Sequence, residues 1–513
     1  MNDWLAVLNW VDWLRVGAIL HFLLAVSVLL RILKIQRNAS IAIAWIAIIF
    51  ALPFVGLVLY LLIGETSLGR QYRERNERIR ALFGQLNRRQ ADVVLPSHYQ
   101  GLSQIGTAWT GFGVYEASHV RLLDNFDGIF DSLLNDICQA KTMILMEFYI
   151  VHPKGRVLEI FDALTQAAVR GVECHLLADS VGSVDFLKKH AKILENAGIK
   201  VHESLPVGLF KTLFERIDLR NHRKIVAIDE KIGYTGSFNL VDPRFFKQDA
   251  GVGQWVDMMM RIEDTHKDGV ISTLASIIAT DIGAENELNM NFITDRLHAY
   301  TRKLYPANDT IASKPSDHCQ SIPSVNKPAV HGVLLQPIPS APQMTAHVIH
   351  STIVTAIHRA NRSVWITTPY FVPDDALFNA LISAAKRGVD ITLIVPKRVD
   401  SFLVRHASAA FYDELMDAGV SIAQFDKGLL HTKSITIDEE YSLFGTVNMD
   451  MRSFYINMEF SFAIYSPKLV AQILHSQKSY FANSDVIDQQ RWQQRPWHTT
   501  LLDNGIRLIG ALL

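Results

Sequence analysis

Apolar residues are concentrated in two runs near the N-terminus of this 513-residue chain. The second run, residues 41–63, holds 23 uncharged and mostly apolar residues, enough for a helix to cross roughly 30 Å of hydrocarbon. The first run, residues 14–33, is shorter and carries His21 and Arg31, but tryptophans before it and basic residues after it can anchor its ends. We therefore predict a transmembrane hairpin over residues 1–65, in preference to a buried hairpin of a soluble protein.

Two crossings would place the N-terminus and the large C-terminal region on the same side of the membrane. Basic residues close to the ends of the spans set the orientation. The short loop between the runs holds Arg31, Lys34 and Arg37. Seven arginines follow the second run: Arg70, Arg73, Arg75, Arg78, Arg80, Arg88 and Arg89. The larger group favours the cytoplasmic face for the C-terminal region, although the loop favours the reverse.

Strand-like and helix-like patterns alternate along the rest of the chain, which is typical of an α/β fold. A buried strand is indicated for residues 142–151, a helix closed by glycine for 157–171 and a second strand for 172–180. The same order of patterns returns in the second half, at residues 363–372, 376–388 and 389–401. The repetition predicts a duplicated α/β unit.

These patterns divide the chain into six segments. Residues 306–342 hold seven of the seventeen prolines, so we expect an extended linker there and not a packed element. The tail combines arginines, tryptophans and an apolar run, and could lie at the membrane interface or pack on the domain. The predicted segments are a transmembrane hairpin (1–65), a basic juxtamembrane segment with a helix around 70–90 (66–115), a first half (116–305), the linker (306–342), a second half (343–485) and an amphipathic tail (486–513).

Each half carries one copy of a histidine, lysine and aspartate motif. The copies read HRKIVAID and HTKSITID, and each is followed by glycine, a hydroxyl residue and an asparagine at the same spacing. Alternate side chains of a strand share a face, so the histidine and lysine of each copy point together and the aspartate points away. The aspartates are then expected to fix a turn at the strand end. The motif residues are His222, Lys224 and Asp229 in the first copy and His431, Lys433 and Asp438 in the second.

Two imidazoles and two ammonium groups around one point form a site for a phosphodiester. One imidazole can attack phosphorus while the other, protonated, gives its proton to the leaving oxygen. Carboxylates can fix the tautomers of the two imidazoles by bonding their far nitrogens. We expect the amides and hydroxyls to bind the phosphate, the carboxylates to orient the histidines and the tyrosines to line the pocket or pack beside it. These residues are Asn239, Asn448, Ser237 and Thr446; Asp257 and Glu459; and Tyr149 and Tyr370.

Other chemistries find little support in the sequence. The formal net charge is −1 and no large basic stripe is present, which disfavours a nucleic-acid partner. No HxH or HExxH motif occurs, and lysine is a poor metal ligand, so we predict no metal and no cofactor.

The motif HxK(x)4D(x)6G[S/T]xN, present twice, resembles that of the phospholipase D superfamily, and within it the bacterial cardiolipin synthases. The stretches NHRKIVAIDEKIGYTGSFNLVDPRFFKQDAGVGQWVD, TTPYFVPDD and GLLHTKSITIDEEYSLFGTVNMDMRSF carry the resemblance, with the paired apolar runs. Thr446 departs from the usual serine but keeps its hydroxyl.

The resemblance implies a duplicated phospholipase D-type α/β sandwich with a pseudo-twofold axis, in which all six motif residues belong to the catalytic site. It implies a multi-pass protein of the bacterial cytoplasmic (inner) membrane that forms cardiolipin and glycerol from two phosphatidylglycerol molecules. The partners would be these phospholipids and the bilayer. By analogy His222 is the nucleophile and His431 the acid and then the base, with the reverse assignment open.

Three other functions remain open from the sequence. The protein could be a phospholipase D that hydrolyses phospholipids to phosphatidic acid, because the motifs do not show whether water is excluded. A nuclease of the superfamily and a membrane protein with decayed motifs are weaker alternatives, since the spans hold the site at a membrane and both motif copies are intact. The donor could also be another phospholipid, such as phosphatidylethanolamine, and the oligomeric state stays open.

Overall fold

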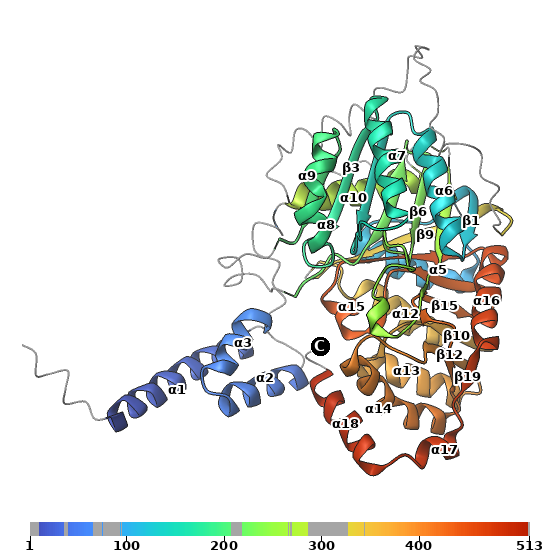
Figure 1. Ribbon diagram of the computed structural model, residues 1–513. Coiled ribbons are helices and arrows are strands. Elements are labelled where there is room, and N and C mark those ends of the chain that lie inside the picture. Colours follow the sequence, from blue (N-terminus) through green and yellow to red (C-terminus); the bar gives the residue numbers. More distant parts are fainter. Residues whose placement is uncertain are drawn as a thin grey trace, which may run out of the picture. The chain divides into compact units, whose positions relative to one another are not determined.

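A computed structural model shows the protein as two compact units, which are described separately (Figure 1). One unit contains the three N-terminal helices, and the other contains the strands and the remaining helices. The structure describes residues 10–34, 39–64, 74, 93, 95–206, 218–264, 266, 269–285, 327–342 and 344–510. The helix expected around residues 70–90 lies almost wholly outside these residues, as do most of the linker and the last three residues of the tail.

The first unit begins with a helix long enough to span a membrane. Helix α1 (Trp10–Lys34) contains a stretch of 20 residues, Arg15–Lys34, with a mean hydropathy of 2.3. It is the one helix among the described residues that is long and apolar enough to cross a bilayer. The expectation of an apolar first span is therefore met by α1.

The second predicted span is not one helix, which corrects the expectation for residues 41–63. Helix α2 (Ala39–Ala51) ends before Pro53, and helix α3 (Val55–Ile63) begins after it. Proline lacks the amide hydrogen of a helix interior and its ring clashes with the preceding turn. Phe54 next to it has φ 60°, which no helix accommodates. The chain therefore turns at this point, and each of the two helices is too short to cross a bilayer alone.

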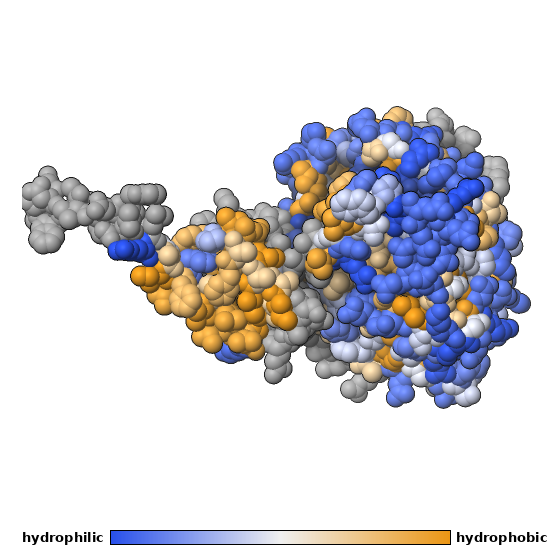
Figure 2. Space-filling model, turned by 90° about the horizontal axis from the view of Figure 1, so that it is seen from below, coloured by the Kyte–Doolittle hydropathy of each residue, from blue (hydrophilic) through white to orange (hydrophobic). Residues whose placement is uncertain are grey.

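The three helices of the first unit pack on one another and expose apolar side chains. The rings of Trp45 on α2 and Tyr60 on α3 meet edge to face at 5.5 Å, and Ile49 and Leu57 are buried with them. Most other large apolar side chains of α1 to α3 are exposed, among them Ile19, Phe22, Leu23, Ile43 and Leu61. Figure 2 shows that hydrophobic residues cover most of the visible face of this unit. An apolar outer surface of this extent suits contact with lipid.

The second unit is built on one 15-stranded sheet. Its first half contains α5 (Ser97–Thr110), β1 (Tyr115–Leu123), α6 (Phe126–Gln139), β2 (Met143–Phe148), α7 (Val157–Val169), β3 (Glu173–Asp179), α8 (Val184–Lys189), α9 (Ala191–Asn196), β4 (Lys200–Ser204), β5 (Lys224–Ile228), β6 (Ile232–Gly236), η2 (Gln248–Ala250), β7 (Trp255–Val256), β8 (Met259–Glu263) and α10 (Val270–Glu285).

Its second half contains β9 (Val330–Ser340), α12 (Val348–Arg359), β10 (Ser363–Thr367), β11 (Phe371–Val372), α13 (Asp375–Lys386), β12 (Asp390–Pro396), α14 (Phe402–Ala418), β13 (Ser421–Phe425), β14 (Leu429–Leu430), β15 (Ser434–Ile437), β16 (Tyr441–Gly445), β17 (Met449–Asp450), α15 (Met451–Tyr455), β18 (Glu459–Ile464), α16 (Pro467–Ala482), β19 (Ser484–Val486), α17 (Gln489–Gln493) and α18 (Trp497–Gly510).

The order of strands shows the duplication directly. Outward from the centre, the first half runs β1-β8-β6-β5-β2-β3-β4 and the second runs β9-β18-β16-β15-β10-β12-β13, with β19 at the far edge. Antiparallel pairing of β1 with β9 joins the halves. In both halves a parallel pair, β2 with β3 and β10 with β12, follows the β-α-β order expected from the sequence. The predicted duplicated α/β fold is confirmed.

Strand β9 corrects the end of the predicted linker, because residues 330–340 lie in the middle of the sheet. Its first part pairs with β1 as far as Leu335, and its last part pairs with β18. Pro337 and Pro339 fall in the last part, where the register with β1 has ended. Proline cannot donate to a strand ladder, so it is tolerated where one neighbour is missing.

Two further segments belong to the domain and not to its flanks. Helix α5, predicted within the basic juxtamembrane segment, buries Tyr99 and Leu102 in the core of the second half. In the predicted tail, α18 packs on α14, where His406 bonds Asp503 at 2.6 Å. Of the two expectations for the tail, packing on the domain describes α18.

The cores explain why the two halves meet rigidly at the motifs. One core lies in each half, and a third is shared, with Leu145 and Ile225 from the first half and Phe444 and Phe460 from the second. The motif strands β5 and β15 contribute to these cores. Strand β5 is therefore held in part by the core that both halves share, and β15 by the core of the second half.

Candidate active site

Each motif histidine lies just before its strand, in a segment that pairs with the other half. The amide of His222 donates to the carbonyl of Met458 at 2.9 Å, and the amide of His431 donates to the carbonyl of Val256 at 2.9 Å. Short parallel pairings, Asn221 with Met458 and β14 with β7, hold these segments together. The residues after Met458 and Val256 are Glu459 and Asp257, so backbone pairing brings each carboxylate to the histidine of the opposite half.

The carboxylates bond the imidazoles across the pseudo-twofold axis. Nδ1 of His222 donates to Glu459 at 2.9–3.0 Å. Nδ1 of His431 donates to Asp257 at 2.6 Å. A hydrogen bond at Nδ1 fixes the tautomer whose lone pair is on Nε2. Both imidazoles are therefore prepared to accept a proton or to attack through Nε2.

Burial keeps the two imidazoles uncharged at neutral pH. It lowers the pKa of both His222 and His431 to about 4, although the carboxylate beside each imidazole opposes the shift. Burial also opposes ionisation of Asp257 and Glu459, but the bonded histidine and the nearby lysine charge hold the pKa of each below its ordinary value. At neutral pH the site thus pairs two neutral imidazoles with two carboxylates.

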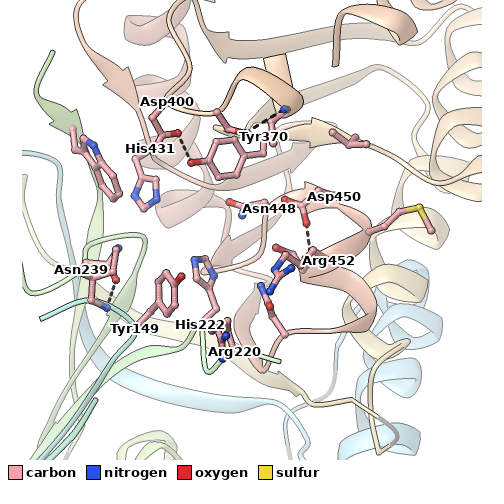
Figure 3. Close-up of a pocket in the computed structure, with 18 of the residues that line it drawn as sticks. Tyr149, Arg220, His222, Asn239, Tyr370, Asp400, His431, Asn448, Asp450 and Arg452 are labelled. Atoms are coloured by element: carbon pink, nitrogen blue, oxygen red, sulfur yellow. Dashed lines mark hydrogen bonds between the residues drawn. The ribbon is translucent and has the colours of Figure 1, made fainter. Parts of the chain in front are cut away.

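Both imidazoles line a single cavity of about 400 Å³ (Figure 3). Tyr149 and Tyr370 line it from the two halves, so the expectation that they face the pocket agrees with their positions. The ring of Tyr149 stands edge-on to His222 with centroids 4.9 Å apart. The hydroxyl of Tyr370 donates to Asp400 at 2.7 Å.

The motif lysines are buried beside the cavity. Lys224 and Lys433 are 0% and 1% exposed, and each ammonium group donates to the carbonyl of its own histidine, at 2.7 and 2.6 Å. Burial lowers the pKa of Lys224 to about 7 and that of Lys433 to about 8. Their charge would favour an anion in the cavity through a medium of low dielectric constant. Direct contact with phosphate oxygens, as expected from the sequence, would need a movement of these side chains.

The two hydroxyls expected to bind phosphate have another role in the structure. Ser237 donates to Asp257 at 2.6 Å, and Thr446 donates to Glu459 at 2.5 Å. Both residues are 0% exposed and neither lines the cavity. This corrects the prediction that the two hydroxyls bind phosphate. Strand alternation showed which way these side chains point, but Asp257 and Glu459 accept their hydrogen bonds. Ser237 and Thr446 hold the carboxylates that hold the histidines.

The motif aspartates lie away from the cavity, which corrects their assignment as catalytic residues. Asp229 accepts the amides of Lys141, Thr142 and Met143 at 2.7–3.0 Å. Asp438 accepts the amides of residues 361–363 at 2.7–3.2 Å. Both sit in a left-handed turn, with φ of 52°. They fix the strand-end turns and tie them to the start of the neighbouring strand, as the alternation argument predicted.

Both motif asparagines line the cavity, as expected. The carbonyl oxygen of Asn239 accepts the amide of Ile150 at 3.1 Å, which leaves its buried NH2 group without a partner among the described residues. A buried donor without a partner costs free energy unless a ligand satisfies it. Asn448 lines the opposite side. An anion between the two histidines would supply the missing acceptor.

Several lining residues were not singled out from the sequence. Trp255 packs against His431 with ring centroids 4.2 Å apart, and Lys247 pairs with Asp400 at 3.0 Å near the same ring. Arg220 and Arg452 complete the cationic side. Arg452 could have been found from the sequence, because it follows the second motif in the stretch NMDMR. Within the described residues no group of three or more His, Cys, Asp or Glu side chains could hold a metal ion, and the absence of a cofactor stays a prediction.

Comparison with known proteins agrees with this arrangement. Two segments, residues 133–266 and 353–480, match the family model described as "Cardiolipin synthase, PLD-like domain". Residues 23–65 match a model described as phospholipase D-nuclease N-terminal. The chain is 38% identical to cardiolipin synthase A of Pectobacterium carotovorum, over 98% of this chain and 99% of that protein. It is 39% identical to cardiolipin synthase A of Yersinia pseudotuberculosis, over 95% of this chain and 96% of that protein.

A solved structure has the same fold. The phosphatidylserine synthase of Haemophilus influenzae superposes with a TM-score of 0.59 at 13% identity and covers 82% of this chain and 100% of its own. That likeness concerns the architecture, whereas the sequence matches extend over nearly the full length and both motif copies. The chain belongs to the family of cardiolipin synthases with phospholipase D-like domains.

Proposed function

We propose that this protein is a cardiolipin synthase, which transfers the phosphatidyl group of one phosphatidylglycerol to a hydroxyl of a second and releases glycerol. The full-length relatives support the reaction. The observation that carries the mechanism is the pair of buried imidazoles, each bonded at Nδ1 to a carboxylate of the other half and each lining one cavity.

In the first step the Nε2 lone pair of one imidazole attacks phosphorus, and the bond from phosphorus to the glycerol oxygen breaks. The other imidazole, protonated in the presence of the bound anion, gives its proton to that oxygen. Glycerol leaves, and the phosphatidyl group stays on histidine as a phosphoramidate. Lys224, Lys433 and the amides of the two asparagines favour the negative charge that builds on the other phosphate oxygens.

The second step reverses the roles. The imidazole that gave its proton takes one from the hydroxyl of the second phosphatidylglycerol, whose oxygen attacks phosphorus. The bond from phosphorus to nitrogen breaks, cardiolipin leaves and the free imidazole is restored. Family resemblance favours His222 as the attacking residue, and the near-symmetry of the site permits the reverse.

Membrane association follows from the apolar N-terminal unit, and we extend the proposal to its topology. We infer a multi-pass protein of the bacterial cytoplasmic (inner) membrane with the catalytic unit on the cytoplasmic side. Because α2 and α3 are each too short to cross a bilayer alone, this topology takes α1 as one crossing and α2 with α3 together as the other. The arginines after residue 69 support the orientation. Fusions of alkaline phosphatase and of a fluorescent protein after residue 36 and after residue 512 test this orientation. Alkaline phosphatase activity at residue 512 would refute the cytoplasmic placement.

The reaction is tested with the full-length protein in detergent, supplied with phosphatidylglycerol and a chelator, while cardiolipin, glycerol and phosphatidic acid are measured. We expect cardiolipin and glycerol in equal amounts. His222→Ala and His431→Ala should each lose the reaction, whereas the exposed His331→Ala is a matched control that should keep it.

Other products would point elsewhere. Phosphatidic acid as the main product would make the protein a phospholipid hydrolase. If cardiolipin formed only when phosphatidylethanolamine was added to phosphatidylglycerol, the donor would be phosphatidylethanolamine. A reaction that appears only after a metal ion is added would contradict the two-histidine mechanism.

A further inference from the structure

One side of the cavity carries two arginines that the transfer mechanism does not use. Arg220 and Arg452 both line the cavity and are partly buried. Backbone bonds bring them together: the carbonyl of Arg220 accepts the amide of Met458, and the carbonyl of Arg452 accepts the amide of Asn457, both at 2.9 Å. Figure 3 shows both guanidinium groups beside His222 and away from His431.

The charges of Arg220 and Arg452 both act on the same part of the cavity, beside His222. Burial raises the pKa of Tyr149, the charges of Asp179 and Glu459 add to this shift, and the charges of Arg220 and Arg452 oppose it. Since the ring of Tyr149 lies against His222, both charges act at the His222 end of the cavity. Two positive charges at one end make a site that an anion can occupy.

Two carboxylates on which the charges of these arginines act, Asp179 and Asp450, also bond the backbone. Asp179 accepts the amides of Val181, Gly182 and Asn221 at 2.9–3.0 Å. Asp450 accepts the amide of Ser453 at 2.6 Å as the N-cap of α15. These bonds hold the carboxylates in place while the arginines line the cavity.

The duplication shows that Arg452 has no counterpart in the cavity from the first half. In the second half, Asp450 and Arg452 follow Asn448. In the first half, Asp242 and Arg244 follow Asn239 in the same order, with one extra residue between the asparagine and the aspartate. In the first half the pair closes on itself, because Arg244 donates to Asp242 at 2.7 and 2.9 Å. Neither residue of that pair lines the cavity.

Arg220 breaks the symmetry in the same direction. It precedes His222 by two residues, and the residue two before His431 is Leu429. Leu429 is fully buried and pairs with Trp255. At the His431 end the cavity is lined by Lys247 paired with Asp400 at 3.0 Å, so that charge is balanced, whereas two arginines line the His222 end.

We propose that Arg220 and Arg452 bind the phosphate of the acceptor lipid. This inference rests on the proposed function, in which the phosphatidyl-histidine and the phosphodiester of the acceptor must be in the cavity at once. The donor has one phosphate, and that phosphate must lie between the two imidazoles. The acceptor brings a second negative charge out of water, which is costly unless cations meet it. The arginine pair meets that requirement on the side where a free hydroxyl must enter, and it selects an anionic glycerophosphate over water or glycerol.

Two acceptors with the same hydroxyl but different charge test the proposal in the wild-type protein. Labelled glycerol exchanges into phosphatidylglycerol through the same phosphatidyl-histidine, without a second phosphate. Labelled glycerol 3-phosphate offers the same hydroxyl with a phosphate attached. We expect glycerol 3-phosphate to be captured at least about tenfold more efficiently than glycerol at equal concentration. Equal capture, or a preference for glycerol, would overturn the proposal.

Variants locate the preference at the arginine pair. Arg452→Gln and Arg220→Gln should each reduce capture of glycerol 3-phosphate, and cardiolipin formation, relative to glycerol exchange by about tenfold or more. Arg452→Lys should restore part of the preference, since the charge remains but the planar fork does not. Arg244→Gln, at the equivalent place in the first half, should leave the ratio unchanged.

The outcomes separate this inference from the proposed function. An equal loss of both reactions in the Gln variants would mean that the arginines bind the donor or support the fold, and would overturn the acceptor site. Neither reaction in the wild-type protein would mean that the proposed function itself is wrong.

Discussion

His222 in the first half is hydrogen-bonded through Nδ1 to Glu459 in the second half, at 2.9–3.0 Å. His431 in the second half makes the equivalent bond to Asp257 in the first half. Each half thus supplies one imidazole and the carboxylate that orients the other. The duplication is therefore functional as well as architectural, because neither half contains a complete histidine and carboxylate pair.

The crossed pairs lead to a first prediction. Glu459→Gln and Asp257→Asn keep the size of the side chains but remove the negative charge that fixes the tautomer. We expect kcat for cardiolipin formation to fall about 10- to 100-fold in each variant, with a smaller change in KM. Initial rates over a range of phosphatidylglycerol concentrations in mixed micelles measure both constants. Glu195→Gln, an exposed carboxylate that pairs with Lys192 at 3.2 Å, is the control. Wild-type kcat in Glu459→Gln would show that orientation is unimportant.

The sequence predicted the members of this site better than their connections. Both motif copies, the two asparagines and both carboxylates were found from residue types and spacing. The crossing was not, because it depends on the pairing of Asn221 with Met458, and of β14 with β7, between segments about two hundred residues apart. Local periodicity carries no information on such pairings.

The errors in the fold have local causes. The second apolar run was judged by its length, and Pro53 within it was given too little weight. The linker was judged by its prolines, but Pro337 and Pro339 lie in a strand at positions that β1 does not reach. In both cases the composition of a long window was right and the position of single prolines decided the structure.

A second prediction concerns the pH dependence of catalysis. In the free enzyme burial lowers the pKa of Lys224 to about 7 and that of Lys433 to about 8. A bound phosphodiester anion favours the charged lysines, so binding takes up protons when the pH is above these values. We expect kcat/KM to fall as the pH rises from about 7 to 9, while kcat falls less. Steady-state kinetics across this range test the expectation, and a constant kcat/KM would contradict it.

A third prediction concerns stability at acid pH. Burial lowers the pKa of His222 and His431 to about 4, below the ordinary value of about 6.5 in an unfolded chain. Between these values the unfolded state binds more protons than the native state, so stability rises with pH across this window and is lost as the pH falls. Each histidine contributes a slope of up to about 1.4 kcal/mol per pH unit.

Urea unfolding of the protein in detergent at pH 4.5, 5.5 and 6.5 measures this slope. His222→Gln and His431→Gln should each reduce it, because the titrating group is gone. The exposed His331→Gln should keep the wild-type slope. Histidine variants that keep the full slope would show that other groups account for the acid sensitivity.

A fourth prediction separates the motif aspartates from the chemistry. Asp229 accepts three backbone amides at the start of β2 through both of its carboxylate oxygens, from a left-handed turn that aspartate adopts more readily than most residues. Asp229→Ala should cost about 1–3 kcal/mol of stability. The fraction that remains folded should keep a kcat within about threefold of the wild type, since the carboxylate is far from the cavity. Unfolding curves and active-site titration give both values; a large fall in kcat without loss of stability would return Asp229 to the catalytic site.

The last prediction assigns the histidines. In an in-line displacement the attacking nitrogen and the entering acceptor oxygen lie on opposite sides of phosphorus. The arginine pair places the acceptor at the His222 end, so His222 should exchange protons with glycerol and the acceptor hydroxyl, and His431 should attack phosphorus. This is the reverse of the assignment by family analogy.

A donor that carries p-nitrophenol in place of glycerol distinguishes the two assignments of the histidines, because an acidic phenol leaves as its anion and needs no proton from the enzyme. His222→Ala should then release up to one equivalent of p-nitrophenol in a burst and stop at the phosphatidyl-enzyme, since no base remains to activate the acceptor. His431→Ala should release none. The opposite pattern would make His222 the nucleophile and would move the acceptor to the His431 end, against the arginine site proposed for it.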